Sequence, residues 1–359
     1  MDSLIASTGF FSACRAATAA GDRVLVHGGT DAGPGYNDYL IALDRETGDE
    51  RWRFGGRARA FDYLSPIAVH DGLAFVGRAD GSLTALDLGS GEVRYQIHIP
   101  GGSIPTPLAP APAPGRGASP YRAATTGGAL LVASNGWLHR LAPATGALLD
   151  RRAIEDATPA VTVQGAGTLW LSSRAGRIAR LDAADLTEVR ARMLDGPLAS
   201  PALVAGNRLV LHLDRAPLLV CDLDEGRTVD RLPPFEGHLR PCTDGQSLFT
   251  ATRHGFLVAW SLADLRPRWE AQAPEPASIA VEGGLLCAET RNGVMLFDAA
   301  TGALRRRIPL AGDEIAPVSL SGGVVYAQRG DCPTRVLCAI PVGALGPAWR
   351  AGVGGYALT

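Results

Sequence analysis

The stretch IALDRETGDERW, residues 41–52, decides the fold of this chain. An apolar segment leads into Asp44, Gly48 follows four residues later, and Trp52 follows four residues after that. The same order recurs in two further stretches, ALDLGSGEVRY at residues 85–95 and LFDAATGALRR at residues 296–306. Self-similarity at a fixed period is the signature of a repeat architecture. The fold is therefore predicted from the repeat.

Alignment on Asp44 divides the chain into eight copies. The aligned residues, spaced by 43, 55, 40, 40, 39, 37 and 43 positions, are Asp44, Asp87, Ala142, Asp182, Asp222, Ser261, Asp298 and Pro341. Four residues after them stand Gly48, Gly91, Gly146, Leu186, Gly226, Leu265, Gly302 and Leu345. Four residues further stand Trp52, Tyr95, Asp150, Arg190, Asp230, Trp269, Arg306 and Trp349. Aspartate caps turns, glycine accepts positive φ and aromatic rings pack between units, so we interpret these positions as scaffold.

Each copy also predicts four short strands. In the copy from residue 65 to residue 99, alternating apolar segments at 66–69, 73–76, 83–86 and 93–99 are separated by Gly- and Asp-containing turns. Proline stands at the start of the first strand in five copies, where no ladder hydrogen bond is lost, at Pro66, Pro159, Pro201, Pro241 and Pro317. Four strands per unit of about 40 residues predict a propeller blade. The chain is therefore predicted to be an all-β, eight-bladed β-propeller with four-stranded antiparallel blades, forming one domain over residues 1–359.

The repeat Asp-x-x-Thr-Gly-x-x-x-Trp, after a strand that ends in Ala-Leu, resembles that of the quinoprotein, or PQQ-like, propeller family. The resemblance extends over essentially the whole chain and implies an eight-bladed propeller. Quinoprotein alcohol dehydrogenases of this family hold their quinone with adjacent cysteines and calcium. No two cysteines are adjacent here, so we expect no PQQ-dependent dehydrogenase and no cofactor. In length the chain resembles the family's outer-membrane assembly lipoproteins.

Composition excludes several classes of function. All 34 basic residues are arginine, so Schiff-base lysine chemistry and a P-loop lysine are excluded. The formal net charge of −2 disfavours a nucleic-acid partner. No apolar run approaches the roughly 18 residues of a membrane-spanning helix. The sequence contains neither a metal-binding nor a nucleotide-binding motif, so no metal site is predicted.

The cysteines and the N-terminal sequence bear on the compartment. Six cysteines are scattered without a C-x-x-C pair, which favours reduced thiols and a cytoplasmic location. Cys332 and Cys338 face each other if they lie on one hairpin, and the sequence leaves their pairing open. The residues before Cys14 faintly resemble a lipoprotein cleavage box, so an exported lipoprotein is the alternative.

Arginine recurs in the turns between the second and third strands of the blades. These turns gather with the connections between blades at one end of a propeller channel, where ligand sites usually lie. The turn arginines are Arg78, Arg174, Arg253, Arg291 and Arg329. If they point inward, they form a basic collar for carboxylates or phosphates. The alternative interpretation is that they are solvated and pair with acidic residues of adjacent loops.

Two connecting loops contain candidate catalytic groups. Glu236, His238 and Arg240 lie within five residues at the entry to blade 6, and His254 comes from the turn of the same blade. A Glu-x-His pair supplies a general base and a group that orients it. The entry to blade 2 contributes Arg59 and Tyr63, of which Tyr63 either donates a proton or packs.

A proline-rich insertion at about residues 100–121 lengthens blade 3. Such a segment favours an extended conformation, and we expect a lid, a docking strip or a tolerated insertion on the channel-entry face. The first functional hypothesis is a binding propeller whose arginine-lined funnel engages a small anionic ligand or a protein partner. The second is a cofactor-independent cyclase, lyase or isomerase acting on an acidic small molecule. The third is an exported assembly scaffold.

Overall fold

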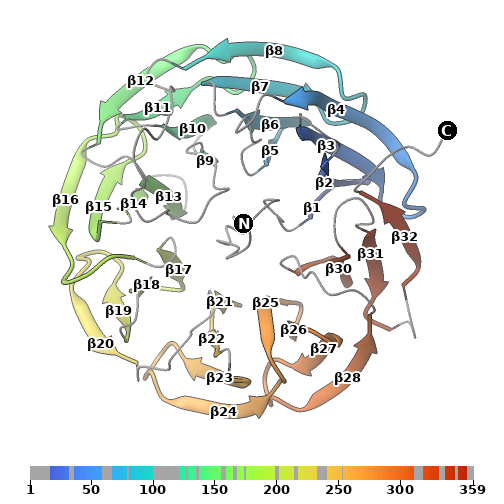
Figure 1. Ribbon diagram of the computed structural model, residues 1–359. Coiled ribbons are helices and arrows are strands. Elements are labelled where there is room, and N and C mark those ends of the chain that lie inside the picture. The colour runs from blue at the N-terminus through green and yellow to red at the C-terminus, as the bar shows by residue number, and fades with distance from the viewer. Residues whose placement is uncertain are drawn as a thin grey trace.

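A computed structural model describes residues 17–31, 36–58, 67–78, 81–99, 122–126, 128–134, 137–154, 159–164, 168–173, 175–198, 202–213, 217–232, 241–252, 254–310, 318–330, 336–343 and 347–353. These residues form eight four-stranded antiparallel sheets, which stand as blades in a ring (Figure 1). No helix occurs among them, so the predicted all-β, eight-bladed propeller is confirmed. In particular, the described ranges contain no helix of the length and apolarity needed to cross a membrane.

Each blade uses four consecutive strands. Blades 1 to 4 contain β1 (Thr18–Ala20), β2 (Arg23–Asp31), β3 (Tyr36–Asp44), β4 (Glu50–Ala58); β5 (Ala68–His70), β6 (Leu73–Gly77), β7 (Ser82–Asp87), β8 (Val93–His98); β9 (Arg122–Thr126), β10 (Ala129–Ser134), β11 (Trp137–Leu141), β12 (Leu148–Ala153); and β13 (Pro159–Gln164), β14 (Thr168–Ser173), β15 (Arg177–Asp182), β16 (Glu188–Met193). Blades 5 to 8 contain β17 (Leu203–Ala205), β18 (Arg208–His212), β19 (Leu218–Asp222), β20 (Thr228–Arg231); β21 (Cys242–Thr243), β22 (Ser247–Ala251), β23 (Phe256–Ser261), β24 (Pro267–Gln272); β25 (Pro276–Glu282), β26 (Leu285–Thr290), β27 (Gly293–Asp298), β28 (Leu304–Pro309); and β29 (Ser319–Ser321), β30 (Val324–Arg329), β31 (Val336–Pro341), β32 (Trp349–Gly352).

The strand pairing confirms the repeat alignment. In seven blades the third and fourth strands shift register one to two residues before the aligned position, as between Ala85 and Leu86 ahead of Asp87. A bulge of this kind bends and twists a strand. Of the predicted prolines, Pro159 begins β13 and Pro241 directly precedes β21. Pro66, Pro201, Pro317 and the insertion at 100–121 lie outside the described residues.

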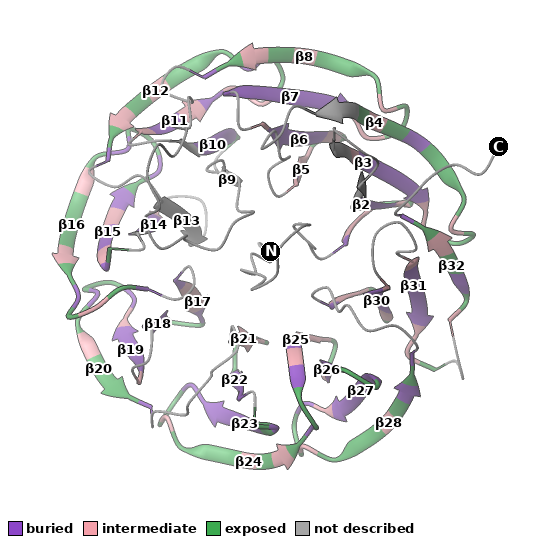
Figure 2. Ribbon diagram, in the orientation of Figure 1, coloured by how far each residue is buried: buried purple, intermediate pink, exposed green. Residues whose placement is uncertain are grey.

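The hydrophobic core lies in the seams between adjacent blades. At the seam between blades 1 and 2, Leu25 and Leu40 pack with Ala74 and Val76. The second and third strands of each blade are mostly buried, whereas the outer strand alternates between exposed and half-buried residues (Figure 2). Because alternate residues of a strand point to opposite sides, each inner strand serves two seams at once. The core is thus a ring of seams that joins all eight blades.

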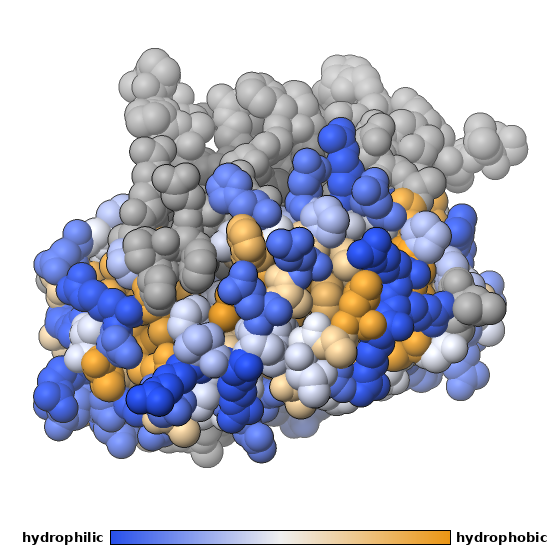
Figure 3. Space-filling model, turned by 90° about the horizontal axis from the view of Figure 1, so that it is seen from below, coloured by the Kyte–Doolittle hydropathy of each residue, from blue (hydrophilic) through white to orange (hydrophobic). Residues whose placement is uncertain are grey.

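The rim of the ring is made by the outer strands. Seven exposed large hydrophobic residues stand on them, namely Val93, Leu148, Leu149, Val189, Met193, Val229 and Leu304. Figure 3, which views the ring edge-on, shows hydrophobic residues interleaved with hydrophilic ones. Isolated exposed hydrophobic residues are normal on a protein surface.

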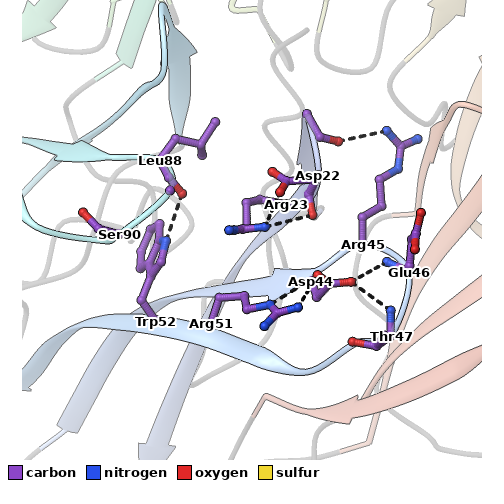
Figure 4. Close-up of polar contacts among 12 residues, drawn as sticks. Asp22, Arg23, Asp44, Arg45, Glu46, Thr47, Arg51, Trp52, Leu88 and Ser90 are labelled. Carbon is purple, nitrogen blue, oxygen red and sulfur yellow. Dashed lines mark hydrogen bonds and ion pairs between the residues drawn. The ribbon is translucent and has the colours of Figure 1, made fainter.

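The repeated aspartate organises the turn between the third and fourth strands. Asp44 Oδ1 accepts hydrogen bonds from the amides of Glu46 (2.9 Å) and Thr47 (3.0 Å), and Gly48 takes a φ of 79° (Figure 4). Asp44 also pairs with Arg51, seven residues later, at 2.8 Å. Asp87–Arg94 and Asp298–Arg305 repeat this ion pair. The predicted scaffold role of the aspartate and the glycine is confirmed, and the arginine belongs to the same unit.

The repeated aromatic residue joins neighbouring blades, as predicted. Trp52 Nε1 donates to the carbonyl of Leu88 in the next blade at 2.9 Å (Figure 4). Equivalent bonds run from Tyr95 to Pro143 O, from Trp269 to Ala299 O and from Trp349 to Arg45 O. In blades 4 and 7 an arginine at this position donates to the next blade instead, from Arg190 to Glu225 O and from Arg306 to Val342 O.

Within the described residues, the ring closes between blades 8 and 1 without exchange of a strand. Blade 1 uses only N-terminal strands and blade 8 only C-terminal strands. Trp349 Nε1 donates to Arg45 O at 3.0 Å, and Arg45 donates to Ser321 O at 3.0 Å and to Gly21 O at 3.3 Å. Tyr326 adds apolar packing at the same seam. Side-chain packing and these hydrogen bonds therefore hold the closure.

Candidate functional site

The turns between second and third strands lie on the same side of the ring as the ends of the outer strands. The amides of Ile99, Leu194 and Ala273, which follow outer strands, donate to the carbonyls of Gly81, Gly176 and Gly255 in those turns, at 2.8 to 2.9 Å. We call this side of the ring the loop face. The opposite side, which we call the hairpin face, contains the turns between third and fourth strands. These turns and the ends of the outer strands, from which the connections between blades depart, thus share a face, as the sequence predicted.

The described residues include four of the eleven predicted site residues. The other seven, namely Arg59, Tyr63, Arg174, Glu236, His238, Arg240 and Arg253, lie outside the described residues, and their roles stay predictions. Arg291 and His254 are exposed in turns of the loop face, in blades 7 and 6. Arg78 is half-buried and places its guanidinium 5.7 Å from the ring centre of Phe54, in blade 1. Arg78 therefore stacks across a seam.

Arg329 occupies a buried position between blades 7 and 8. Its side chain is 3% exposed, and its Nε lies 3.4 Å from Oε1 of Glu289, which is 0% exposed. The guanidinium also donates to Thr290 O at 2.7 Å and to Arg291 O at 3.3 Å. Arg329 thus holds the turn that carries Arg291. Of the predicted site residues within the described ranges, these two are brought together, through the backbone of Arg291.

Strand alternation explains why Glu289 and Arg329 meet. On β26, Cys287 faces the seam with blade 8, and Glu289 lies two residues further along the same strand. On β30, Val325 and Ala327 face that seam, and Arg329 follows at the same period of two. The apolar residues of both strands pack in this seam, and the two charged side chains that continue the same faces are buried with them.

Burial dominates the electrostatics of this pair. Burial raises the pKa of Glu289 to about 8, and the charge of Arg329 offsets only part of that effect. Burial, with a contribution from Glu289, also raises the pKa of Cys287 well above its ordinary value. Among the described residues, no hydrogen bond reaches either carboxylate oxygen of Glu289 or Nε of Arg329. Because solvent does not reach Glu289, its carboxyl group acts on the seam and not on a molecule at the surface.

Sequence reasoning missed Glu289. The sequence signal was a single glutamate in the otherwise apolar strand LLCAET, residues 285–290. The turn pattern of the repeat points to the neighbouring Arg291, which is exposed, and contains no signal for Glu289. Its partner Arg329 stands 40 residues later in the chain, so no local motif connects the two.

The described residues offer little for a metal or a thiol-held cofactor. They contain no group of three or more His, Cys, Asp or Glu side chains placed to hold a metal ion. The four described cysteines, Cys221, Cys242, Cys287 and Cys338, lie on four different blades. The proposed pairing of Cys332 with Cys338 involves a residue outside the described part of the chain.

Comparisons with known proteins agree with the repeat and with the fold. The family model of outer membrane protein assembly factor BamB matches residues 6–109, which include the first two copies of the repeat. No curated protein sequence matches the chain. The solved structure of BamB from Moraxella catarrhalis is similar with a TM-score of 0.62 at 18% identity, covering 88% of this chain and 91% of that one.

Two other similar structures have different origins. The computationally designed protein Ika8 gives a TM-score of 0.68 at 14% identity, covering 94% of this chain and 96% of that one. The dihydro-heme d1 dehydrogenase NirN, in complex with DHE, gives a TM-score of 0.68 at 15% identity, and the match covers 95% of this chain and 75% of that one. These identities show a shared fold. The chain is an eight-bladed β-propeller. Within that class, its first repeats match the family of the assembly factor BamB.

Proposed function

We propose that this chain is a binding scaffold that engages a protein partner through its loop face, in the assembly of outer-membrane proteins. The observation that carries the proposal is the match of residues 6–109 to the family of outer membrane protein assembly factor BamB. A propeller fold alone supports many functions, so the family match supplies the direction. The proposal favours the exported alternative, with Cys14 as the lipidated residue, over the cytoplasmic location.

The loop face supports an anionic contact on the partner. Arg291 and His254 are exposed on neighbouring blades, and Arg329 fixes the backbone of the turn that carries Arg291. A guanidinium group binds carboxylates with paired hydrogen bonds, so an acidic segment of a partner suits this face. The arginine collar remains part of the proposal, with Arg78, Arg174 and Arg253 as further turn arginines. Arg329, predicted as a member, is buried in a seam and does not line the funnel. Arg59 and Arg240 of the connecting loops remain proposed ligand-binding residues.

Catalysis has weaker support than binding. An enzyme working in the funnel needs an accessible group with a shifted pKa. Among the described carboxyl groups, the one whose pKa burial raises to about 8 is Glu289, and it is sealed in a seam. The enzyme alternative therefore rests on His238, Glu236 and Tyr63, with an acidic small molecule as substrate.

Site-specific photo-crosslinking in cells tests the proposed face. A photo-crosslinking residue replaces Arg291 on the loop face, and a matched variant places it at Ala300, exposed on the hairpin face of the same blade. We expect a discrete protein adduct from position 291 and none from position 300. Equal labelling at both positions, or no adduct at 291, would contradict a partner on the loop face.

Thermal shift distinguishes a small anionic ligand from a protein partner. Purified protein is mixed with di- and tricarboxylic acids, alongside the variants Arg291→Ala and Arg307→Ala. Arg307 is an exposed arginine of the outer strand β28 and serves as the charge-matched control. Stabilisation of the wild type and of Arg307→Ala, but not of Arg291→Ala, would assign a small-molecule site and replace the protein-partner proposal.

A further inference from the structure

The buried pair Glu289 and Arg329 joins blades 7 and 8 at the loop face, away from the hydrogen bonds that the repeat makes between blades. Arg329 leaves β30 of blade 8 and donates to the carbonyls of Thr290 and Arg291 in blade 7. The aromatic and arginine contacts of the repeat link blades from the fourth strand to the hairpin face, as from Arg306 to Val342 O at 3.1 Å. The Arg329 contacts instead link the two blades at the loop face.

We propose that Glu289 and Arg329 form a pH-sensitive latch across the seam between blades 7 and 8, which holds the turn at residues 290–293 while Glu289 keeps its proton and loosens when that proton is lost. The latch is a property of the fold and does not rest on the proposed binding function. Both side chains are sealed from solvent, so a change of charge at Glu289 acts directly on the packing of the seam.

The geometry explains the direction of the change. Neutral Glu289 leaves the guanidinium free to donate to Thr290 O at 2.7 Å and to Arg291 O at 3.3 Å. A carboxylate buried without hydrogen bonds is strongly unfavourable. Nε of Arg329, 3.4 Å from Oε1 and without a hydrogen bond, can compensate only one of the two carboxylate oxygens. The second oxygen then draws a further guanidinium donor away from the carbonyls, or water enters the seam. Either response releases the turn.

The surroundings of Glu289 contain few other charges. Among the described residues, the titratable or charged groups facing it are Arg329 on β30, Cys338 on β31 and Cys287 on its own strand. Its register partners on β25 and β27 are Ser278 and Val294, which do not titrate. Burial raises the pKa of both thiols, so they stay protonated at neutral pH.

Linkage gives the sign of the pH dependence. The pKa of Glu289 is raised from 4.5 to about 8 on folding, so the folded state holds a proton that the unfolded state releases above about pH 4.5. The stabilisation is complete below that pH and is lost as the pH rises toward 8. Loosening of the turn is expected as the pH passes through the folded pKa.

The test compares melting temperatures from pH 5 to pH 9 in the wild type, Glu289→Gln and the control Glu270→Gln. Glu270 is an exposed carboxyl on β24. We expect the wild type and Glu270→Gln to lose at least about 5 °C relative to Glu289→Gln over this range. Parallel profiles for all three proteins, or a gain of the wild type over Glu289→Gln with rising pH, would overturn the latch.

Two measurements on the wild type stand even if Glu289→Gln fails to fold. The infrared carbonyl band of a protonated carboxyl group is expected near pH 6.5 and should vanish by pH 9. Amide exchange of residues 290–293, corrected for the intrinsic effect of pH, should become faster over the same range, while exchange at residues 299–302 of the hairpin face stays unchanged. Absence of the band at pH 6.5, or uniform exchange behaviour at both turns, would overturn the proposal.

Discussion

Asp150 and Leu186 replace, at the seam between blades 3 and 4, the pair of an aromatic residue and a glycine that joins other blades. Leu186 is 1% exposed and packs with Leu131, Leu138 and Leu169 from both sides of the seam. It takes a φ of 56°, the conformation that glycine has elsewhere in the repeat. Asp230 and Leu265, with a φ of 58°, make the same exchange between blades 5 and 6. Where a blade lacks the aromatic ring, a leucine side chain from the turn of the next blade packs in the seam instead.

This exchange predicts coupling between positions 150 and 186. Leu186→Gly removes a buried side chain but relieves the strained backbone, so we expect a net loss of about 1 to 4 kcal/mol. Adding Asp150→Trp restores the ring-and-glycine pair and should recover at least about 1 kcal/mol. Denaturant unfolding of the two single variants and of the double variant measures the coupling. If the changes in the free energy of unfolding of the two single variants add up to that of the double variant, the two positions are not coupled.

The contact between Gly91 and Trp52 predicts a second effect. A Cβ atom at Gly91, where φ is 76°, would lie 2.6 Å from the indole ring. Gly72 has a similar φ of 73° but open space around it. Gly72→Ala should therefore cost about 1 kcal/mol, for the backbone alone, whereas Gly91→Ala should cost about 2 to 4 kcal/mol. Equal costs in denaturant unfolding would mean that the ring moves aside freely.

The repeat aspartates predict a loss of stability in acid. Arg94, and then the amide of Ser90, lower the pKa of Asp87 to about 2. The folded pKa lies below the unfolded value of 3.8, so the stabilisation is present above about pH 4 and is lost as the pH falls toward 2. The melting temperature of Asp87→Asn should lie below that of the wild type at pH 6, and the gap should close by pH 2. Glu46→Gln, at an exposed turn position, serves as the control and should show no such convergence.

The repeat made the fold predictable from the sequence, but it did not predict which charged residues are buried. Asp87, Gly91 and Tyr95 each act within their own copy or on an adjacent one, so their spacing alone places the blades. Glu289 and Arg329 meet only because both side chains face the seam between blades 7 and 8. The spacing of residues within one repeat does not determine which seam a side chain faces. The turn arginines show the same limit, because one pattern yields the exposed Arg291 and the buried Arg329.

Ring closure predicts a difference between two tryptophans that make the same contact. Trp269 donates to Ala299 O and Trp349 donates to Arg45 O, both at 3.0 Å, and each ring covers a glycine of the next blade. The chain itself connects blades 6 and 7, whereas the contacts between blades 8 and 1 are, within the described residues, side-chain packing and hydrogen bonds. Replacement of either tryptophan by alanine should cost about 3 to 5 kcal/mol.

The two variants should differ in where the structure opens. In Trp349→Ala, the seam between blades 8 and 1 has no chain connection to hold it, so β1, β2, β31 and β32 should exchange their amides by local opening, ahead of global unfolding. In Trp269→Ala the continuous chain keeps the seam together, and exchange should follow global stability. Hydrogen exchange measured by mass spectrometry separates these outcomes. If the seam between blades 6 and 7 opens locally to the same extent in Trp269→Ala, the chain connection does not stabilise a seam against local opening.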